Sequence, residues 1–507
     1  MKSQSTTDSA LKGALWIGSG VGGQVFIQII VLMILARILS PADFGVVTAS
    51  LVISGLGLIF TEIGVGPSIV QKKIISNNHI RAGFFVSVIL AGMMAYLINE
   101  LRMEISELFN IKELAEVIPC LALIYLLRGF SVVSESLLQR EHEFKKIAIV
   151  EFISYSLGYG VTSITLAYHG YSYWSLIIAQ LVQATIRSIL FFILKKISII
   201  PTFEITPYRE LLHYGVGFTA ARFANYIANQ SDKFIIGRYL GESALGLYGR
   251  SYQLAIMPIN LIGRILDKVA FPILSSLQDD VSKLRASYEK LLVSASFLAL
   301  PISCLLFILS DEIILSILGD SWTNVIVTFQ IMVIGLLFRL SYRISDSMLK
   351  ALGKVYKRAL RQILYALMVL LLSYAGSSYG VNGVAAGVLW AVLINALMMA
   401  QLCLKETKHS WKEVVQFVFS GYRFALIVST PVFLVNLLLN YYPMLAIAEL
   451  ILLMIIWLFS VVLIIRYIPN IVFRNIEINI LNSILNNIPV KLKKYLFGSQ
   501  QIARESN

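Results

Sequence analysis

The chain has 507 residues, of which 57% are hydrophobic and only 14% charged, and its mean hydropathy is +0.77. A soluble globule of this size could not cover its surface with so few polar side chains, so the composition excludes one and predicts a membrane protein. The net charge of +13 raises nucleic-acid binding as an alternative. The basic residues lie in short loops between apolar segments, however, which argues against a nucleic-acid partner.

Apolar segments long enough to cross a bilayer recur along the whole chain, since a spanning helix needs roughly 20 such residues. The first is too long for the core of a signal peptide and has no small-residue cleavage site, so we expect it to be retained. The predicted fold is an all-α polytopic membrane protein with about fourteen spans. These are 14–39, 42–64, 80–100, 114–138, 146–168, 172–194, 213–236, 244–270, 286–310, 324–349, 356–377, 381–404, 420–440 and 444–466.

The loops between these spans alternate in charge. Loops on the side of the N-terminus, such as "QKKIISNNHIR" from residue 71, are basic, whereas "SDEIILSILGDSWTN" from residue 310 is acidic. Lys and Arg accumulate in cytoplasmic loops, so this pattern predicts a cytoplasmic N-terminus. An even number of spans returns the C-terminus to the same side.

The chain also contains an internal repeat. Matching residues include Arg37 with Arg238, Leu39 with Leu240, Gly45 with Gly246, Ser50 with Ser251, Arg128 with Arg339, Ser134 with Ser345 and Glu135 with Asp346. Each copy holds six predicted helices, so the copies enter the membrane in the same orientation and form a parallel repeat, as in several transporter folds. The predicted parts are an N-terminal bundle (1–197), a cytoplasmic linker (198–212), a C-terminal bundle (213–405), helices thirteen and fourteen (406–466) and a basic cytoplasmic tail (467–507).

Several charged and amide side chains fall inside the predicted spans. Each charge costs roughly 2.5–3.5 kcal/mol near a helix centre, so a group of them indicates a polar cavity or mutual pairing. Guanidinium groups suit a diphosphate, because they donate several charge-assisted hydrogen bonds. The predicted anion-binding residues are Arg128, Arg222, Lys233, Arg250, Arg339 and Arg343, and the predicted polar lining is Gln24, Gln28, Asn225 and Asn229.

The acids at similar depth allow two interpretations. Glu135, Asp232 and Asp346 are candidates for cation coupling or for ion pairing. In the structural alternative, Arg128 and Arg339 pair with Glu135 and Asp346 and only hold helices together. Asp232 and Lys233 are adjacent on a helix, about 100° apart, so each needs a different partner. We assign Glu62 to a membrane interface or a loop. The histidine and cysteine spacings indicate no metal site, and no P-loop occurs.

Four segments carry a resemblance to a known family: "LARILSPADFGVVTASLVI", "GVGPSIVQKK", "LLQREHEFKKIAIVE" and "DKFIIGRYLGESALGLYGRSYQL". They resemble the Wzx-type polysaccharide and O-antigen flippases, in the branch of colanic acid exporters. These belong to the multidrug/oligosaccharidyl-lipid/polysaccharide (MOP) exporter superfamily, which includes the MATE transporters. The resemblance implies a fourteen-helix protein of the bacterial cytoplasmic (inner) membrane that carries undecaprenyl-diphosphate-linked oligosaccharides. Its other small-molecule partners would be the membrane lipids around it. The resemblance also implies a polysaccharide polymerase and a chain-length regulator as protein partners, and proton or sodium coupling without any other cofactor.

The sequence therefore predicts a flippase for surface polysaccharide synthesis (exopolysaccharide, O-antigen or capsule) and not an enzyme. We expect alternating access through a basic central cavity between the two bundles. One alternative is a small-molecule or drug exporter of the same fold. A membrane glycan polymerase or ligase is less favoured, because the external loops are short.

Overall fold

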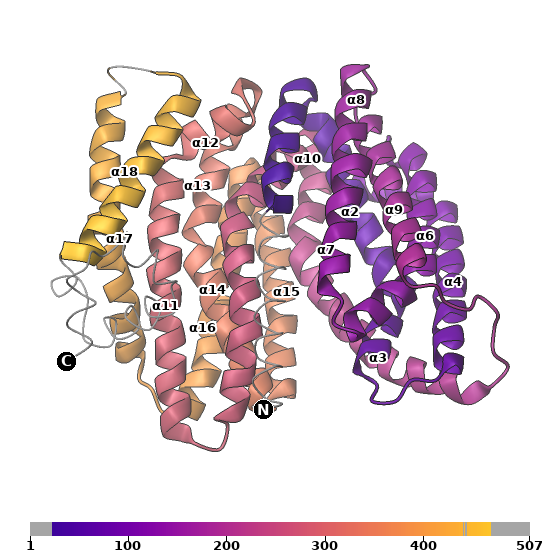
Figure 1. Cartoon of the computed structure of the whole chain (residues 1–507). Coiled ribbons are helices and arrows are strands. Elements are labelled where there is room, and N and C mark those ends of the chain that lie inside the picture. Colours follow the sequence, from indigo (N-terminus) through magenta and orange to yellow (C-terminus); the bar gives the residue numbers. More distant parts are fainter. Residues whose placement is uncertain (1–22, 440, 442–443, 468–507) are drawn as a thin grey trace. The chain divides into compact units, whose positions relative to one another are not determined.

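The computed structural model describes residues 23–439, 441 and 444–467, and every regular element there is a helix (Figure 1). The chain divides into two compact units. The first holds the described residues up to Arg250 together with Ile317–Ser321, and the second holds those of Ser251–Ser316 and from Trp322 onward.

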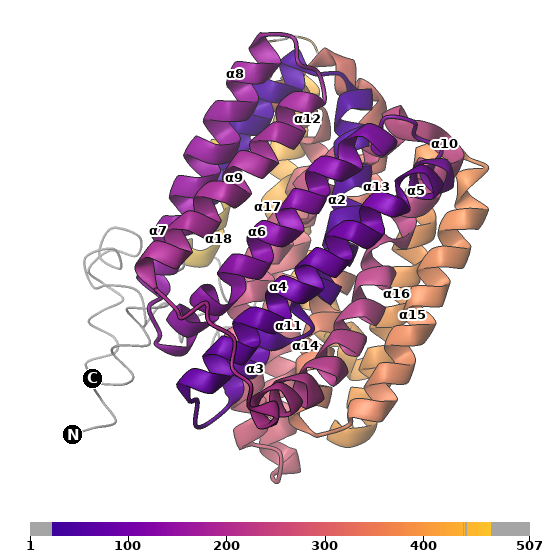
Figure 2. The same cartoon turned by 90° about the vertical axis from the view of Figure 1, so that its right-hand side faces the viewer.

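The first unit contains the N-terminal helices. α4 packs on α6 and α6 packs on α9, so the three lie side by side (Figure 2). The elements are Gly23–Ile38, α2 (Pro41–Glu62), α3 (Val65–Gln71), α4 (Asn77–Glu100), α5 (Arg102–Phe109), α6 (Leu114–Arg140), α7 (Phe144–Ile153), the π-helix η1 (Ser154–Val161), α8 (Thr162–Tyr168), α9 (Trp174–Leu194) and the part of α10 (Ile205–Ser276) up to Arg250.

The second unit contains the remaining part of α10 and the helices that follow it. Its main contacts join α15 with α16 and α11 with α17. The elements are α11 (Val281–Ile308), α12 (Ser310–Ile317), the 3-10 helix η2 (Asp320–Val325), α13 (Ile326–Ile334), α14 (Leu336–Ala351), α15 (Val355–Ser377), α16 (Gly380–Thr407), α17 (Trp411–Leu439) and α18 (Ala446–Tyr467).

Eleven helices in the described part of the chain are long and apolar enough to span a membrane. A multi-pass membrane fold is therefore confirmed, whereas the count of fourteen is not. The first predicted span begins outside the described residues and continues as the shorter helix Gly23–Ile38. Two others merge into α10, which begins at Ile205, inside the predicted linker, and bends at Gly241.

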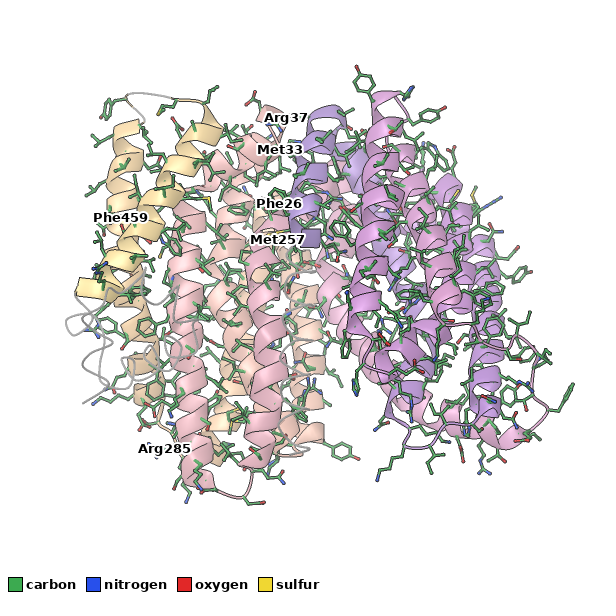
Figure 3. The ribbon with its side chains drawn as sticks, in the orientation of Figure 1. Phe26, Met33, Arg37, Met257, Arg285 and Phe459 are labelled. Atoms are coloured by element: carbon green, nitrogen blue, oxygen red, sulfur yellow. The ribbon has the colours of Figure 1, made fainter. Side chains whose placement is uncertain are left out.

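The start of α2 follows directly from the sequence. Ser40 caps the helix, because its hydroxyl accepts a hydrogen bond from the Asp43 amide while the Asp43 carboxylate accepts one from the Ser40 amide. Pro41 occupies the first turn, where a missing amide proton costs nothing. Arg37 lies in the last turn of the preceding helix, and its guanidinium donates to the Met33 carbonyl at 3.2 Å (Figure 3).

α2 and α10 cross at very short range. A methyl group on Gly45 would lie 1.8 Å from the Glu242 carbonyl oxygen, and one on Gly246 would lie 1.8 Å from the Pro41 carbonyl oxygen. Only glycine permits this approach of two backbones. In the register of the repeat, Gly45 matches Gly246 and Pro41 matches Glu242, so the contact is reciprocal between the two copies.

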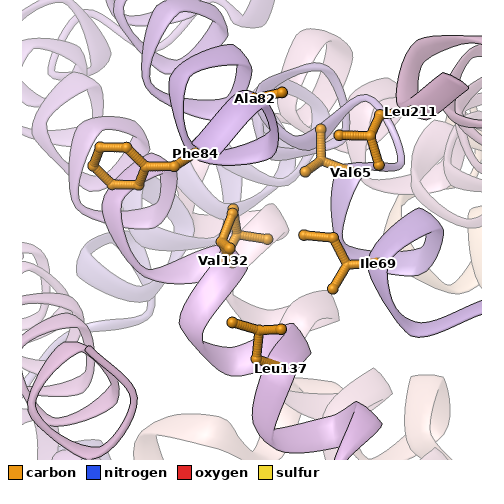
Figure 4. Packing of buried hydrophobic residues seen from close by; sticks show 8 residues of the cluster. Val65, Ile69, Ala82, Phe84, Val132, Leu137 and Leu211 are labelled. Atoms are coloured by element: carbon orange, nitrogen blue, oxygen red, sulfur yellow. The ribbon is translucent and has the colours of Figure 1, made fainter. Parts of the chain in front are cut away.

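The end of α2 is broken, and this break places the charged residues described below. Ile63 has a φ of 32° and Gly64 a φ of 64°, so the chain turns between α2 and α3. Val65 and Ile69 of α3 then join the buried cluster shown in Figure 4, which also includes Leu211 of α10. A β-branched residue with positive φ is rare and strained.

Candidate functional site

A buried ionic network lies beside the break between α2 and α3. Arg128 of α6 is held between two carboxylates: its Nε lies 2.7 Å from Glu62 Oε1, and its Nη1 bonds to Glu135 Oε2. The side chains of Glu62 and Glu135 are 7% and 9% exposed. Buried charges of this kind need partners, because the loss of water costs several kcal/mol per ion. The ion pair between Arg128 and Glu135 that the structural alternative expected is therefore present.

The network continues on both sides of Arg128. Arg222 of α10 places Nη1 2.8 Å from Glu62 Oε2. Arg187 of α9 lies 3.3 Å from Glu135 Oε2 and 2.7 Å from Glu151 Oε1. Together these six side chains carry three positive and three negative charges, so the arginines of this network are balanced by acids.

Glu62 corrects the sequence interpretation. We expected an interfacial or loop charge, but the residue is buried and binds Arg128 and Arg222 at once. Its position at the last turn of α2, before the break at Ile63, turns it toward α6 and α10. The sequence contained one usable signal, because the acid directly precedes an Ile-Gly pair within an apolar segment.

A pocket of about 370 Å³ opens onto this network in the first unit. Its polar lining comes from Glu62, Arg128, Glu135, Ser136 and Gln139. The Gln139 amide donates to Glu135 Oε1 at 3.2 Å, and the Ser136 hydroxyl donates to a carbonyl of its own helix. Gln139 was not among the predicted site residues, although it lies one helical turn beyond Glu135.

Four predicted site residues on α10, namely Asn225, Asn229, Asp232 and Lys233, make local bonds along this helix. The Asn229 amide donates to the Asn225 carbonyl at 2.8 Å. Asp232 accepts from the Tyr248 hydroxyl at 2.6 Å, and Lys233 Nζ donates to Gln230 Oε1 at 2.6 Å. Asp232 and Lys233 therefore bond to different partners, as their helical positions require. The Asp232 bond joins the two arms of α10 across its bend.

Two further predicted positions lie elsewhere in this unit. The guanidinium of Arg250 stacks 4.5 Å above the ring of Phe44 and is almost fully buried, which is a cation–π arrangement. Gln24 and Gln28 are half-buried on the helix Gly23–Ile38.

The second unit arranges the matching residues differently. The Asp346 carboxylate binds Lys350 Nζ at 2.7 Å and the Arg358 guanidinium. Arg339 lies 5.4 Å from the ring centre of Tyr252. The pairing of Asp346 in this unit thus involves Lys350 and Arg358, two bases that our candidate set omitted.

The guanidinium of Arg343 is only partly hydrogen-bonded among the described residues. Its Nη2 donates to Asn260 Oδ1 at 3.0 Å, whereas its buried Nη1 has no hydrogen-bond partner in the described part of the chain. Nη1 lies against Gly263, where even a methyl group would come within 1.7 Å of it. Buried guanidinium donors normally have partners, so this group is suited to an acceptor such as an anion.

Comparison with known proteins places the chain in a family. The family model described as "Polysaccharide biosynthesis protein" matches residues 34–327. The chain belongs to this family. The resemblance found in the sequence is thereby confirmed.

Several curated relatives cover most of the chain. It is 26% identical to the lipopolysaccharide biosynthesis protein WzxC of Escherichia coli K12, over 79% of this chain and 82% of the relative. It is 21% identical to the teichuronic acid biosynthesis protein TuaB of Bacillus subtilis, over 69% of this chain and 73% of the relative. It is also 26% identical to the succinoglycan biosynthesis transport protein ExoT of Rhizobium meliloti, over 59% of this chain and 60% of the relative.

Solved structures confirm the fold class. The lipid II flippase MurJ in an inward closed conformation aligns with a TM-score of 0.69 at 15% identity, over 88% of this chain and 100% of that one. A multidrug resistance MATE transporter of the MOP superfamily, in an inward-facing conformation, aligns with a TM-score of 0.60 at 16% identity, over 76% and 96%. At these identities the likeness shows the MOP fold and nothing about substrate.

Proposed function

We propose that this protein is a flippase that carries undecaprenyl-diphosphate-linked oligosaccharide units across a bacterial inner membrane, with both termini in the cytoplasm. The names of its relatives, which include a succinoglycan transport protein, support a role in exporting glycan precursors. The glycan and diphosphate would pass through a cavity between two six-helix bundles while the polyprenyl tail stays in lipid. No bond is made or broken in this process.

The observation that carries the proposal is the exposure and the hydrogen bonding of two intramembrane arginines. Arg222 is 46% exposed, and Arg343 has a donor without a partner in the described residues. Guanidinium groups that keep unused donors inside a membrane protein suit phosphate oxygens, which accept several charge-assisted bonds. A carrier of cationic or neutral compounds would have no use for them.

Alanine substitutions in the full-length protein test this function. In a strain whose surface polysaccharide depends on this protein, we expect Arg222→Ala and Arg339→Ala to abolish export while the protein still inserts. Arg187→Ala is the matched control, because Arg187 serves two carboxylates of the balanced network and is expected to leave export in place. Surface polysaccharide and membrane-inserted protein are quantified together. Normal surface polysaccharide in both of the first two variants would refute an anion-binding role.

A further inference from the structure

The first part of α10 is bound to α2, to α3 and to the start of α4 along one line of contacts, which we call the seam. At one end, Glu210 Oε2 accepts from His79 Nε2 at 2.8 Å and bonds to Lys72. Farther along, the Ser68 hydroxyl donates to the Leu211 carbonyl at 3.2 Å. The seam thus begins with an ionic contact and continues with close backbone packing.

The middle of the seam contains the strained break. A methyl group on Gly215 would lie 2.0 Å from the Ile63 carbonyl oxygen, so the α10 backbone rests directly on this residue. The left-handed conformation of Ile63 is strained and persists only where surrounding contacts impose it. α10 supplies these contacts. Removing α10 from the seam would therefore release the strain at Ile63.

The far end of the seam is the ion pair between Arg222 and Glu62. Among the described residues, the ion-pair partner of Arg222 is Glu62 alone, and nearly half of the Arg222 side chain is exposed. Glu62 is different, because it keeps Arg128 as a second partner when Arg222 leaves. The pair can therefore open without leaving a buried carboxylate uncompensated, which would otherwise be costly.

We propose that Glu62 occupies the place of a substrate phosphate on Arg222, and that a diphosphate displaces it and thereby opens the seam. This inference rests on the proposed function, because it takes the diphosphate of the lipid carrier as the ligand. The chemistry is an exchange of counter-ions. Arg222 gives up a carboxylate for phosphate oxygens, Glu62 stays with Arg128, and the contact that holds α10 against the Ile63 break is lost.

Opposite effects of two neutral variants on binding test the exchange. Glu62→Gln removes the competing carboxylate and its charge-assisted bond to Arg222, so we expect it to bind undecaprenyl diphosphate about tenfold more tightly than the wild type. Arg222→Gln removes the receptor and should bind about tenfold more weakly. Both are measured on the purified full chain, with uncharged undecaprenol as control ligand. Equal or weaker binding by Glu62→Gln would refute the exchange.

Opening of the seam is measured separately, by the reactivity of a cysteine within it. Ser68 is only 4% exposed, so a cysteine at this position should react slowly while the seam is closed. Ser68→Cys is introduced into a variant in which Cys120, Cys304 and Cys403 have been replaced by serine. We expect undecaprenyl diphosphate to speed maleimide labelling of this cysteine about tenfold, and both neutral variants to label fast without ligand. Ser87→Cys, on α4 and fully buried, is the control and should stay slow.

The two proposals fail in different ways. If the wild type exports polysaccharide but undecaprenyl diphosphate does not change the labelling of Ser68→Cys, the seam inference is wrong and the transport function stands. If loss of the protein leaves lipid-linked glycan export intact, the proposed function itself is wrong.

Discussion

The two copies of the predicted internal repeat share a helix crossing but differ in the groups that contact their arginines. Gly45 and Gly246 make the same contact in the same register. The alignment that pairs these glycines also places Glu62 opposite Gly263. In the first copy the acid at this position neutralises Arg128, whereas in the second copy the glycine leaves room for the Arg343 guanidinium.

If the predicted repeat reflects a duplication, this difference gives the two copies unequal charge. Backbone contacts at the crossing tolerate no side chain in either copy, so both copies keep glycine there. The charged positions are less constrained by packing, and one substitution of glycine for glutamate changes the charge balance of a bundle. A buried guanidinium opposite a carboxylate forms a structural pair, whereas one opposite an amide keeps the capacity to bind an anion.

The crossing should give the largest effect when it is disturbed. In Gly45→Val and Gly246→Val, a side chain is forced onto a carbonyl oxygen, and overpacking of this kind costs typically about 1–3 kcal/mol and sometimes more. We expect each variant to lower the melting temperature of the detergent-purified protein by several degrees, and by similar amounts. Export should fall in parallel.

The matched control for the crossing is Gly92→Val on α4, since a side chain added there meets nothing within 4 Å. It should melt within a degree of the wild type. A large loss for Gly45→Val together with none for Gly246→Val would contradict the reciprocal contact.

The difference in charge between Glu62 and the matching Gly263 can be tested with an isosteric substitution beside Arg343. Asn260→Asp places a carboxylate 3.0 Å from Arg343 Nη2 and so gives the second copy the acid that it lacks. Because this carboxylate would compete with phosphate, we expect export to fall about tenfold while the melting temperature is maintained. Asn110→Asp adds the same charge at a helix end and should export normally. Unchanged export by Asn260→Asp would remove Arg343 from the binding site.

The sequence predicted the multi-pass membrane fold and most helices, because hydropathy is a local property, and the internal repeat stays a prediction. It also offered the pairing of Arg128 with Glu135 as one of two interpretations. It did not predict that Glu62 joins them, since that requires knowing where α2 breaks and which helix packs beside the break. The bond from Asp346 to Arg358 depends on the turn between α14 and α15, which spacing alone does not reveal. Lys350 follows Asp346 by four residues on α14, so the spacing did contain a signal for that pair, and our candidate set omitted it.

The smallest effect is expected at the ionic end of the seam, in Glu210→Gln. The bond from His79 and, after it, the one from Lys72 hold the pKa of the Glu210 carboxyl below its usual value of 4.5. A lowered pKa means that the stabilisation is complete above the usual value and disappears as the pH falls through the lowered one. The pair is exposed, so its loss should change the melting temperature by about a degree or less.

Glu210→Gln should therefore melt slightly below the wild type from pH 7 down to about pH 5, and the difference should vanish in stronger acid. Its labelling at Ser68→Cys should rise modestly over the same range, because α10 is then held only by the rest of the seam. Glu413→Gln, which removes an ion pair with Arg285 in the other unit, should leave this labelling unchanged. If Glu210→Gln labels as fast as Glu62→Gln, the exposed contact, and not the buried pair of Arg222 with Glu62, controls the seam.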